Sequence, residues 1–192
     1  MNQRPPSPTA DRDSELLAVR CQLGEAAAFD ELVARWHGPL WRYVLAMCGD
    51  PALAEEILQD GWLRILRALP ALRQPSRLRP WLFSILRRAF VDRLRARAGE
   101  SHLEPLAEEP RAAREPELPW EDLELLTQAL EELEPWDREA TVLFYLRELE
   151  LRDIAEVQGV PVGTVKSRLH RSRRLLRTFL EARGITSEEL SS

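Results

Sequence analysis

The spacing of apolar residues is the feature that most limits the fold of this chain. Apolar side chains recur every three or four residues along nearly the whole sequence, and no run alternates strictly between apolar and polar residues as a half-buried strand does. In the segment 51–69, Leu53, Ile57 and Ile65 share one stripe with Gly61. The sequence therefore predicts an all-α fold.

A segment poor in apolar residues divides the chain into two parts. Residues 98–119 contain four prolines and six glutamates, a composition typical of a flexible linker. We expect two small helical domains on either side of this acidic linker, at residues 14–97 and 120–183. Residues 1–13 and 184–192 are expected to be loose tails.

Glycine and proline mark where helices of the first domain should begin and end. Ser14 is the expected N-cap of the first helix, and the pair Gly38-Pro39 is expected to interrupt the second. Asp50 followed by Pro51 predicts the start of a third helix, because aspartate accepts hydrogen bonds from the first turn and proline suits the first helical position.

Charge is segregated along the chain, although the formal net charge is only −5. Residues 64–97 carry ten arginines and one acidic group, and residues 164–183 carry seven basic groups and one acidic group. Residues 98–163 between them carry 18 acidic groups and five basic ones. These blocks favour two separate basic surfaces, although solvated helix faces would give the same counts.

Two faces of the first domain are candidates for binding. Arginines near Trp81, Phe83 and Phe90 suit nucleic acid, since arginine pairs with phosphate and aromatic rings stack on bases; at least one of these rings is expected in the core. In the segment 51–69, Leu63 lies on a face with acidic and amide residues. That face is either a docking edge for another protein or an ordinary solvated surface.

The segment 151–170 has the spacing of a helix-turn-helix. Ala155 is small where two helices must approach, Gly159 permits a left-handed turn, and Pro161 suits the start of the second helix. A hairpin used only for packing is the alternative. The residues expected on the outward face of the second helix, where they suit major-groove reading and phosphate contact, are Thr164, Lys166, Ser167, His170, Arg171 and Arg174.

Motifs of catalysis are absent from the sequence, which has no glycine-rich phosphate loop and no familiar nucleophile or metal motif. Zinc at Cys21, His37 and Cys48 is an alternative to two small buried thiols. We expect no enzyme activity, no catalytic residue, no cofactor, no metal and no small-molecule substrate. Without a long apolar run or a secretory signal, the chain is expected to be cytoplasmic and not inserted in a membrane.

Together these segments resemble the extracytoplasmic-function sigma factors of bacterial RNA polymerase. Residues 54–60 (Ala-Glu-Glu-Ile-Leu-Gln-Asp) are similar to the polymerase-binding helix of that family. Residues 81–85 (Trp-Leu-Phe-Ser-Ile) and 92–95 (Asp-Arg-Leu-Arg) are similar to its minus-ten and melting segment. Ile154-Ala155-Glu156 and residues 161–169 (Pro-Val-Gly-Thr-Val-Lys-Ser-Arg-Leu) are very close to its minus-thirty-five helix-turn-helix.

The resemblance covers roughly residues 25–97 and 120–182. It implies a sigma factor that binds core RNA polymerase and directs initiation by recognising the minus-thirty-five duplex, through the outward face described above, and melted minus-ten DNA. The residues it implies for polymerase binding are Glu55, Glu56, Gln59, Asp60 and Leu63. Those it implies for the separated minus-ten strand are Arg73, Gln74, Ser76, Arg77, Trp81, Arg87, Arg88 and Arg95.

Two residues depart from the family pattern. Arg88 stands where the family usually has asparagine, which implies changed base recognition or a phosphate contact in its place. Gln158 stands where an apolar residue is usual, so we expect looser packing between the two helices of the helix-turn-helix. The resemblance also implies an anti-sigma factor as a partner, and an acidic linker that threads the RNA channel of the polymerase.

Two other functions fit parts of the sequence. A stand-alone helix-turn-helix transcriptional regulator would bind DNA without polymerase, but it has no need of the arrangement in residues 51–97. A helical adaptor that works only through protein contacts would not depend on Lys166 or Arg171. The sigma factor hypothesis uses both halves of the chain.

Overall fold

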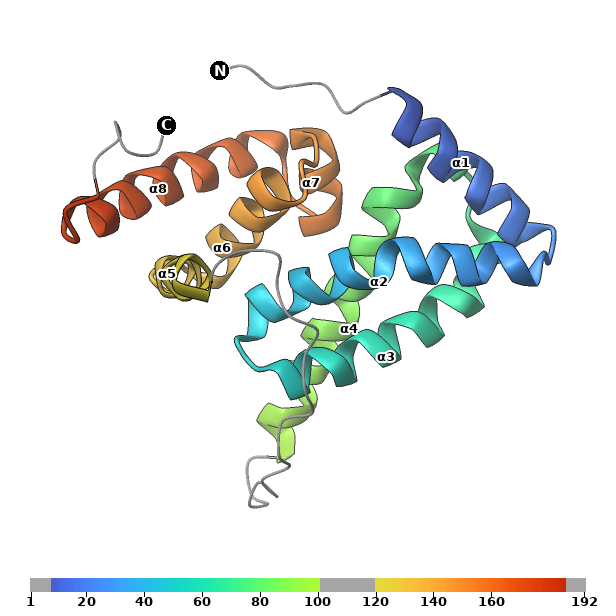
Figure 1. Cartoon of the computed structure of the whole chain (residues 1–192), viewed down its shortest axis with the longest axis horizontal. Helices are drawn as coiled ribbons and strands as arrows, with labels where there is room; N and C mark the ends of the chain where they lie inside the picture. Colours follow the sequence, from blue (N-terminus) through green and yellow to red (C-terminus); the bar gives the residue numbers. More distant parts are fainter. Residues whose placement is uncertain (1–7, 101–119, 186–192) are drawn as a thin grey trace. The chain divides into compact units, whose positions relative to one another are not determined.

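The computed structural model describes residues 8–100 and 120–185, and every regular element within these ranges is helical (Figure 1). The chain forms two compact units, residues 1–110 (the N-terminal unit) and residues 111–192 (the C-terminal unit). The all-α prediction with two helical regions is confirmed. Most of the predicted linker, with its proposed path through the polymerase, lies outside the described residues.

Four helices make up the N-terminal unit: α1 (Pro8–Gln22), α2 (Ala26–Cys48), α3 (Pro51–Ala68) and α4 (Leu78–Glu100). Two 3-10 turns, η1 (Leu69–Ala71) and η2 (Pro75–Arg77), connect α3 to α4. Helices α2, α3 and α4 pack against one another (Figure 1). Their core is aromatic at its centre, because Phe83 meets Tyr43 and Trp36 edge to face, with ring centroids 5.2 and 6.4 Å apart.

Two sequence signals explain how α3 is placed. The Asp50 carboxylate accepts hydrogen bonds from the backbone N–H groups of Ala52 and Leu53, at 2.9 and 3.2 Å, so the predicted N-cap is confirmed. Gly61 faces α4, where a Cβ atom would lie 2.6 Å from Cδ1 of the buried Leu86. The glycine therefore allows α3 and α4 to approach closely.

Two predicted helix boundaries are wrong. Helix α1 begins at Pro8, so the expected tail over residues 1–13 is helical in its second half and Ser14 is buried inside the helix instead of capping it. Helix α2 continues through Pro39. A proline inside a helix costs about 3 kcal/mol, but the uninterrupted α2 buries Trp36, Leu40 and Tyr43 against the core, which offsets that cost.

Apolar residues at helical spacing are mostly buried, and the exceptions lie at the edges of the apolar stripes. Phe83 and Phe90 are buried, as expected for at least one ring of the trio, whereas Trp81 is partly exposed. Leu66 and Leu94 are apolar and lie at helical spacing from buried residues, yet both are about half exposed. Leu66 lies about 140° around α3 from Gly61, too far to share its packing with α4.

The C-terminal unit contains α5 (Trp120–Glu131), α6 (Pro135–Thr141), a π-helical turn η3 (Val142–Leu146), α7 (Leu151–Gln158) and α8 (Val162–Glu181). Helices α7 and α8 form the predicted helix-turn-helix. Gly159 ends α7 with a φ of 66°, a left-handed conformation that favours glycine. Ile154 and Val165 are both fully buried, one on each helix of the motif.

Gln158 contradicts the expectation of looser packing. Its side chain is buried, and its Nε2 donates to the Trp136 carbonyl and to Oε2 of Glu139, both at 3.0 Å. Its Oε1 accepts a 2.8 Å hydrogen bond from Nη1 of Arg168. The amide therefore joins α6, α7 and α8 through directional bonds at a position where an apolar side chain would contribute contact area alone.

Candidate nucleic-acid interface

The outward face of α8 is open to solvent. Val165, Leu169 and Phe179 bury the opposite side of the helix. The helical repeat of 3.6 residues then turns the six predicted DNA-reading residues to the other side. Of these, Lys166, Ser167, His170, Arg171 and Arg174 are exposed and Thr164 is partly exposed.

Arg171 differs from the other residues of this face because it has a strong partner inside the unit. Its Nε and Nη2 donate to the two carboxylate oxygens of Asp137, the second at 2.7 Å, in the paired geometry that a guanidinium and a carboxylate favour. The Asp137 side chain is 1% exposed and that of Arg171 is 52% exposed. This hydrogen bonding raises the pKa of Arg171 above its usual value.

The backbone of Asp137 is also fixed. Its carbonyl accepts a hydrogen bond from the hydroxyl of Thr141 at 2.8 Å. The Ser172 hydroxyl lies 3.3 Å from the same carbonyl and shares its one hydrogen with the Arg168 carbonyl at 3.0 Å. Sequence reasoning missed Asp137, because it lies 34 residues from Arg171 and no local pattern links them. A carboxylate in the first turn of a predicted helix reads as an ordinary helix-start residue.

A second exposed stripe runs along α4. Trp81, Arg88 and Arg95 follow at intervals of seven residues, which places them on the side of α4 away from its buried residues. The Arg88 Nε donates to the Ser84 carbonyl at 3.1 Å, and the Arg95 side chain is 79% exposed. Arg87, also predicted here, lies to one side of this stripe and is partly exposed.

The turns before α4 carry the other predicted minus-ten residues. Arg73, Gln74 and Ser76 are exposed, and Arg77 is partly exposed. Helix α1 holds this segment in place, because Nε2 of Gln22 donates to the carbonyls of Leu69 at 3.1 Å and Leu72 at 2.7 Å. Sequence reasoning did not identify this role of α1, since the bonds join residues about 50 positions apart.

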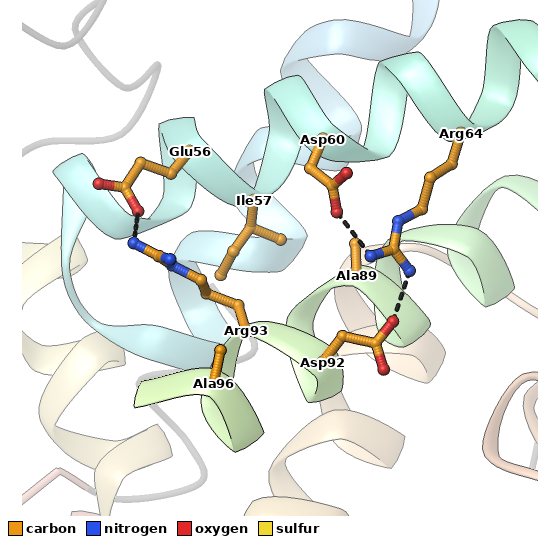
Figure 2. A pocket seen from close by; sticks show the side chains of 8 residues that line it. All are labelled: Glu56, Ile57, Asp60, Arg64, Ala89, Asp92, Arg93 and Ala96. Carbon is orange, nitrogen blue, oxygen red and sulfur yellow. Dashed lines mark hydrogen bonds and ion pairs between the residues drawn. The ribbon is translucent and has the colours of Figure 1, made fainter. Parts of the chain in front are cut away.

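Two acidic residues of α3 have arginine partners at a groove between α3 and α4, one on α4 and one on α3 itself (Figure 2). Glu56 contacts Arg93 at 2.6 Å, Asp60 contacts Arg64 at 2.8 Å, and Arg64 reaches Asp92 at 2.6 Å. These contacts border a hollow of about 390 Å³. Glu56 and Asp60, two predicted polymerase-binding residues, thus face α4.

The other predicted docking residues are less engaged within the unit. Leu63 is 52% exposed, and Gln59 is exposed. The Glu55 carboxylate is partly exposed, with Nε2 of Gln59 at 3.5 Å from its Oε1. The structure therefore divides the predicted docking set into two carboxylates with arginine partners, Glu56 and Asp60, and three residues with no such partner among the described residues, Glu55, Gln59 and Leu63.

The described residues contain no group of three or more histidine, cysteine or acidic side chains that could hold a metal ion. The alternative of a zinc site at Cys21, His37 and Cys48 is therefore not supported. Burial raises the pKa of both thiols above the usual value. Over the same residues, no helix is both long enough and apolar enough to span a bilayer.

Two family patterns match the two units. The pattern described as "Sigma-70 region 2" matches residues 32–100, and that described as "Sigma-70, region 4" matches residues 123–176. The chain is 34% identical over 173 residues to "ECF RNA polymerase sigma factor SigE" of Mycolicibacterium smegmatis, covering 85% of this chain and 66% of that protein. It is 31% identical over 162 residues to "ECF RNA polymerase sigma factor SigM" of Bacillus subtilis, covering 83% and 98%.

Solved structures show the same fold. One is the sigma factor RpoE in complex with the anti-sigma factor NepR from Bartonella quintana, with a TM-score of 0.67 and 26% identity, covering 80% of this chain and 96% of that one. Another is CnrH in complex with the cytosolic domain of CnrY, with a TM-score of 0.67 and 25% identity, covering 88% and 97%.

Proposed function

The chain belongs to the extracytoplasmic-function sigma factors of RNA polymerase, and from this premise we propose how its surfaces divide the work of promoter recognition. The C-terminal unit binds the minus-thirty-five duplex, the N-terminal unit binds the separated minus-ten strand, and α3 docks on core polymerase. The chain catalyses nothing itself, and it directs the polymerase to a promoter in the cytoplasm.

The minus-thirty-five contact is made by the outward face of α8. Ser167 and His170 lie where they meet base edges in the major groove, and Lys166 and Arg174 lie where they meet phosphates. The observation that carries this proposal is that α8 keeps these side chains exposed while its opposite face is buried in a complete helix-turn-helix.

The minus-ten contact is made by the exposed stripe of α4 and the turns before it. Trp81 offers a ring for base stacking, while Arg88 and Arg95 offer charge for the phosphates of a single strand. Exposed Arg73, Gln74 and Ser76 extend this surface towards a flipped base. The two hydrogen bonds from Gln22 hold the turns in a fixed position beforehand, which lowers the entropy lost on binding.

Docking on polymerase centres on Leu63 and Gln59. An exposed leucine beside an amide supplies apolar area and directional bonding, and about half of the Leu63 surface is open to solvent. Glu56 and Asp60 contribute at the edge, where each carboxylate already has an arginine partner. Their charge therefore steers polymerase less than two free carboxylates would.

An anti-sigma factor is the proposed regulator. One similar structure described above is a sigma factor in complex with an anti-sigma factor, and the other is CnrH in complex with the cytosolic domain of CnrY. Such a partner would act by covering the surfaces that polymerase and DNA need.

Mapping RNA 5′ ends after overproduction of the chain, followed by transcription in vitro, tests the proposed function. The upstream sequence shared by the induced transcripts supplies the promoter fragment. We expect the purified chain alone to bind this fragment weakly, and the chain with core polymerase to start RNA at the mapped position. Joining two weak contacts on one chain makes the second effectively intramolecular, which explains the gain.

Two outcomes would overturn this assignment. Tight, specific binding of the fragment without polymerase, and no transcription with it, would identify a stand-alone regulator. Transcription that survives the Lys166→Ala and Arg174→Ala double variant unchanged would show that α8 does not read the promoter.

A further inference from the structure

We propose that Asp137 is a positioning residue for promoter recognition: its buried carboxylate fixes the guanidinium of Arg171 in one orientation on the outward face of α8. This inference rests on the proposed function, because it concerns the same DNA-reading face. It assigns a role in DNA binding to a residue of α6 that itself has no exposed surface.

The geometry of the pair supports this role. Nε and Nη2 of Arg171 are both engaged by Asp137, so rotation about the last side-chain bonds would break two hydrogen bonds at once. A single hydrogen bond to a flexible partner would leave the guanidinium group free to rotate. The Nη1 edge of Arg171 is left to meet a base or phosphate, on a side chain that is 52% exposed.

The anchor itself cannot move easily. Asp137 is buried, and its carbonyl accepts a hydrogen bond from the hydroxyl of Thr141, with the Ser172 hydroxyl of α8 at 3.3 Å. Helix α6 packs against α8, so a shift of the Asp137 backbone would disturb the packing of the two helices. The orientation of Arg171 is thus set by the packing of the unit before any DNA arrives.

The Asp137–Arg171 pair also affects the salt dependence of DNA binding, which a purely structural role of Asp137 would leave unchanged. A guanidinium that already faces a carboxylate is partly neutralised, so it displaces fewer counterions from DNA than a free arginine does. Arg171 should therefore contribute less than Lys166 to the salt dependence of binding. The orientation of Arg171 adds discrimination between base sequences, whereas the unpaired cations add affinity for any duplex.

The test compares the chain with Asp137→Asn, Arg171→Ala, Arg171→Lys and the Asp137→Asn, Arg171→Ala double variant. Each is assembled with core polymerase and titrated with the mapped promoter fragment and with the same fragment altered in its upstream element. The ratio of the two affinities is measured at several salt concentrations. Glu132→Gln is the matched control, because it removes one exposed carboxylate from the same unit.

We expect Asp137→Asn to reduce the specificity ratio at least about fivefold, the lower end of what one well-oriented base contact supplies. The salt slope should steepen by up to about 0.9, because the freed guanidinium now acts as a full charge. In the Arg171→Ala background, Asp137→Asn should have no further effect on either quantity. Arg171→Lys, which keeps the charge without the fork, should lower the ratio even if Asp137→Asn proves too unstable to assay.

The results distinguish a failure of the positioning role of Asp137 from a failure of the proposed DNA-binding role of α8. If Arg171→Ala lowers the specificity ratio but Asp137→Asn and Arg171→Lys do not, the positioning role is wrong while the DNA-reading face stands. If Arg171→Ala changes neither ratio nor slope, and Lys166→Ala also changes neither, the proposed function of α8 is itself wrong. Asp137→Asn that lowers only the melting temperature would mark Asp137 as purely structural.

Discussion

Replacing Gln158 by leucine should destabilise the C-terminal unit, although the resemblance to the family implies an apolar residue at this position. In this chain the amide makes three hydrogen bonds, to the Trp136 carbonyl, Glu139 and Arg168. Leucine has a similar volume and fits the site. It cannot replace any of the three bonds.

The magnitude follows from two opposing contributions. Hydrogen bonds contribute about 0.5–1.5 kcal/mol each when both groups are neutral and about 1.5–3 kcal/mol when one is charged. Two of the three bonds involve Glu139 or Arg168, so at least roughly 4 kcal/mol is lost. Burying the additional apolar surface of leucine returns about 2 kcal/mol. The unit should therefore lose at least about 2 kcal/mol of unfolding free energy.

Hydrogen exchange of the full chain shows whether this loss of stability falls in the C-terminal unit. Amides of α7 and α8 should lose at least about 30-fold of their protection, which is the equivalent of 2 kcal/mol. Amides of α2 and α3 should be unchanged and serve as an internal control. Gln128→Leu is the matched variant, because Gln128 is exposed and its contact with Arg183 is a long one of 3.4 Å; its effect should stay below about 0.5 kcal/mol. Protection of α7 and α8 that is equal to or greater than that of the parent chain would refute the reasoning.

Three further predictions concern other parts of the chain. Lys166→Ala should weaken holoenzyme binding to all duplexes alike and reduce the salt slope by about one unit, whereas Ser167→Ala should change base preference by about 1–3 kcal/mol; titrations at several salt concentrations distinguish them. Leu63→Asp should weaken assembly with core polymerase in a pull-down or a titration while leaving the unfolding curve unchanged, and equal polymerase affinity would remove Leu63 from the docking surface. Asp50→Ala should cost about 1 kcal/mol of stability through the lost N-cap, with Asp50→Asn as the variant that keeps most of it; chemical denaturation that shows equal stability for all three would contradict the capping argument.

Helical periodicity and local chemistry determine much of this protein. The all-α class, the division into two helical units, the Asp50 cap and the turn at Gly159 all follow from residues close together in sequence. They do so because each depends on the backbone preferences of a few neighbouring residues. The candidate DNA-reading residues of α8 could be chosen for the same reason, since one helical turn decides which side chains share a face.

Contacts between distant residues belong to the tertiary structure alone. Helix α2 continues through Pro39 because the aromatic and aliphatic residues around the proline pack against other helices, and that energy is invisible to a local rule. Arg171 looks in the sequence like any other basic residue of an exposed helix. Only the packing of α6 on α8 brings the buried Asp137 to it, where the guanidinium gains two hydrogen bonds to one carboxylate.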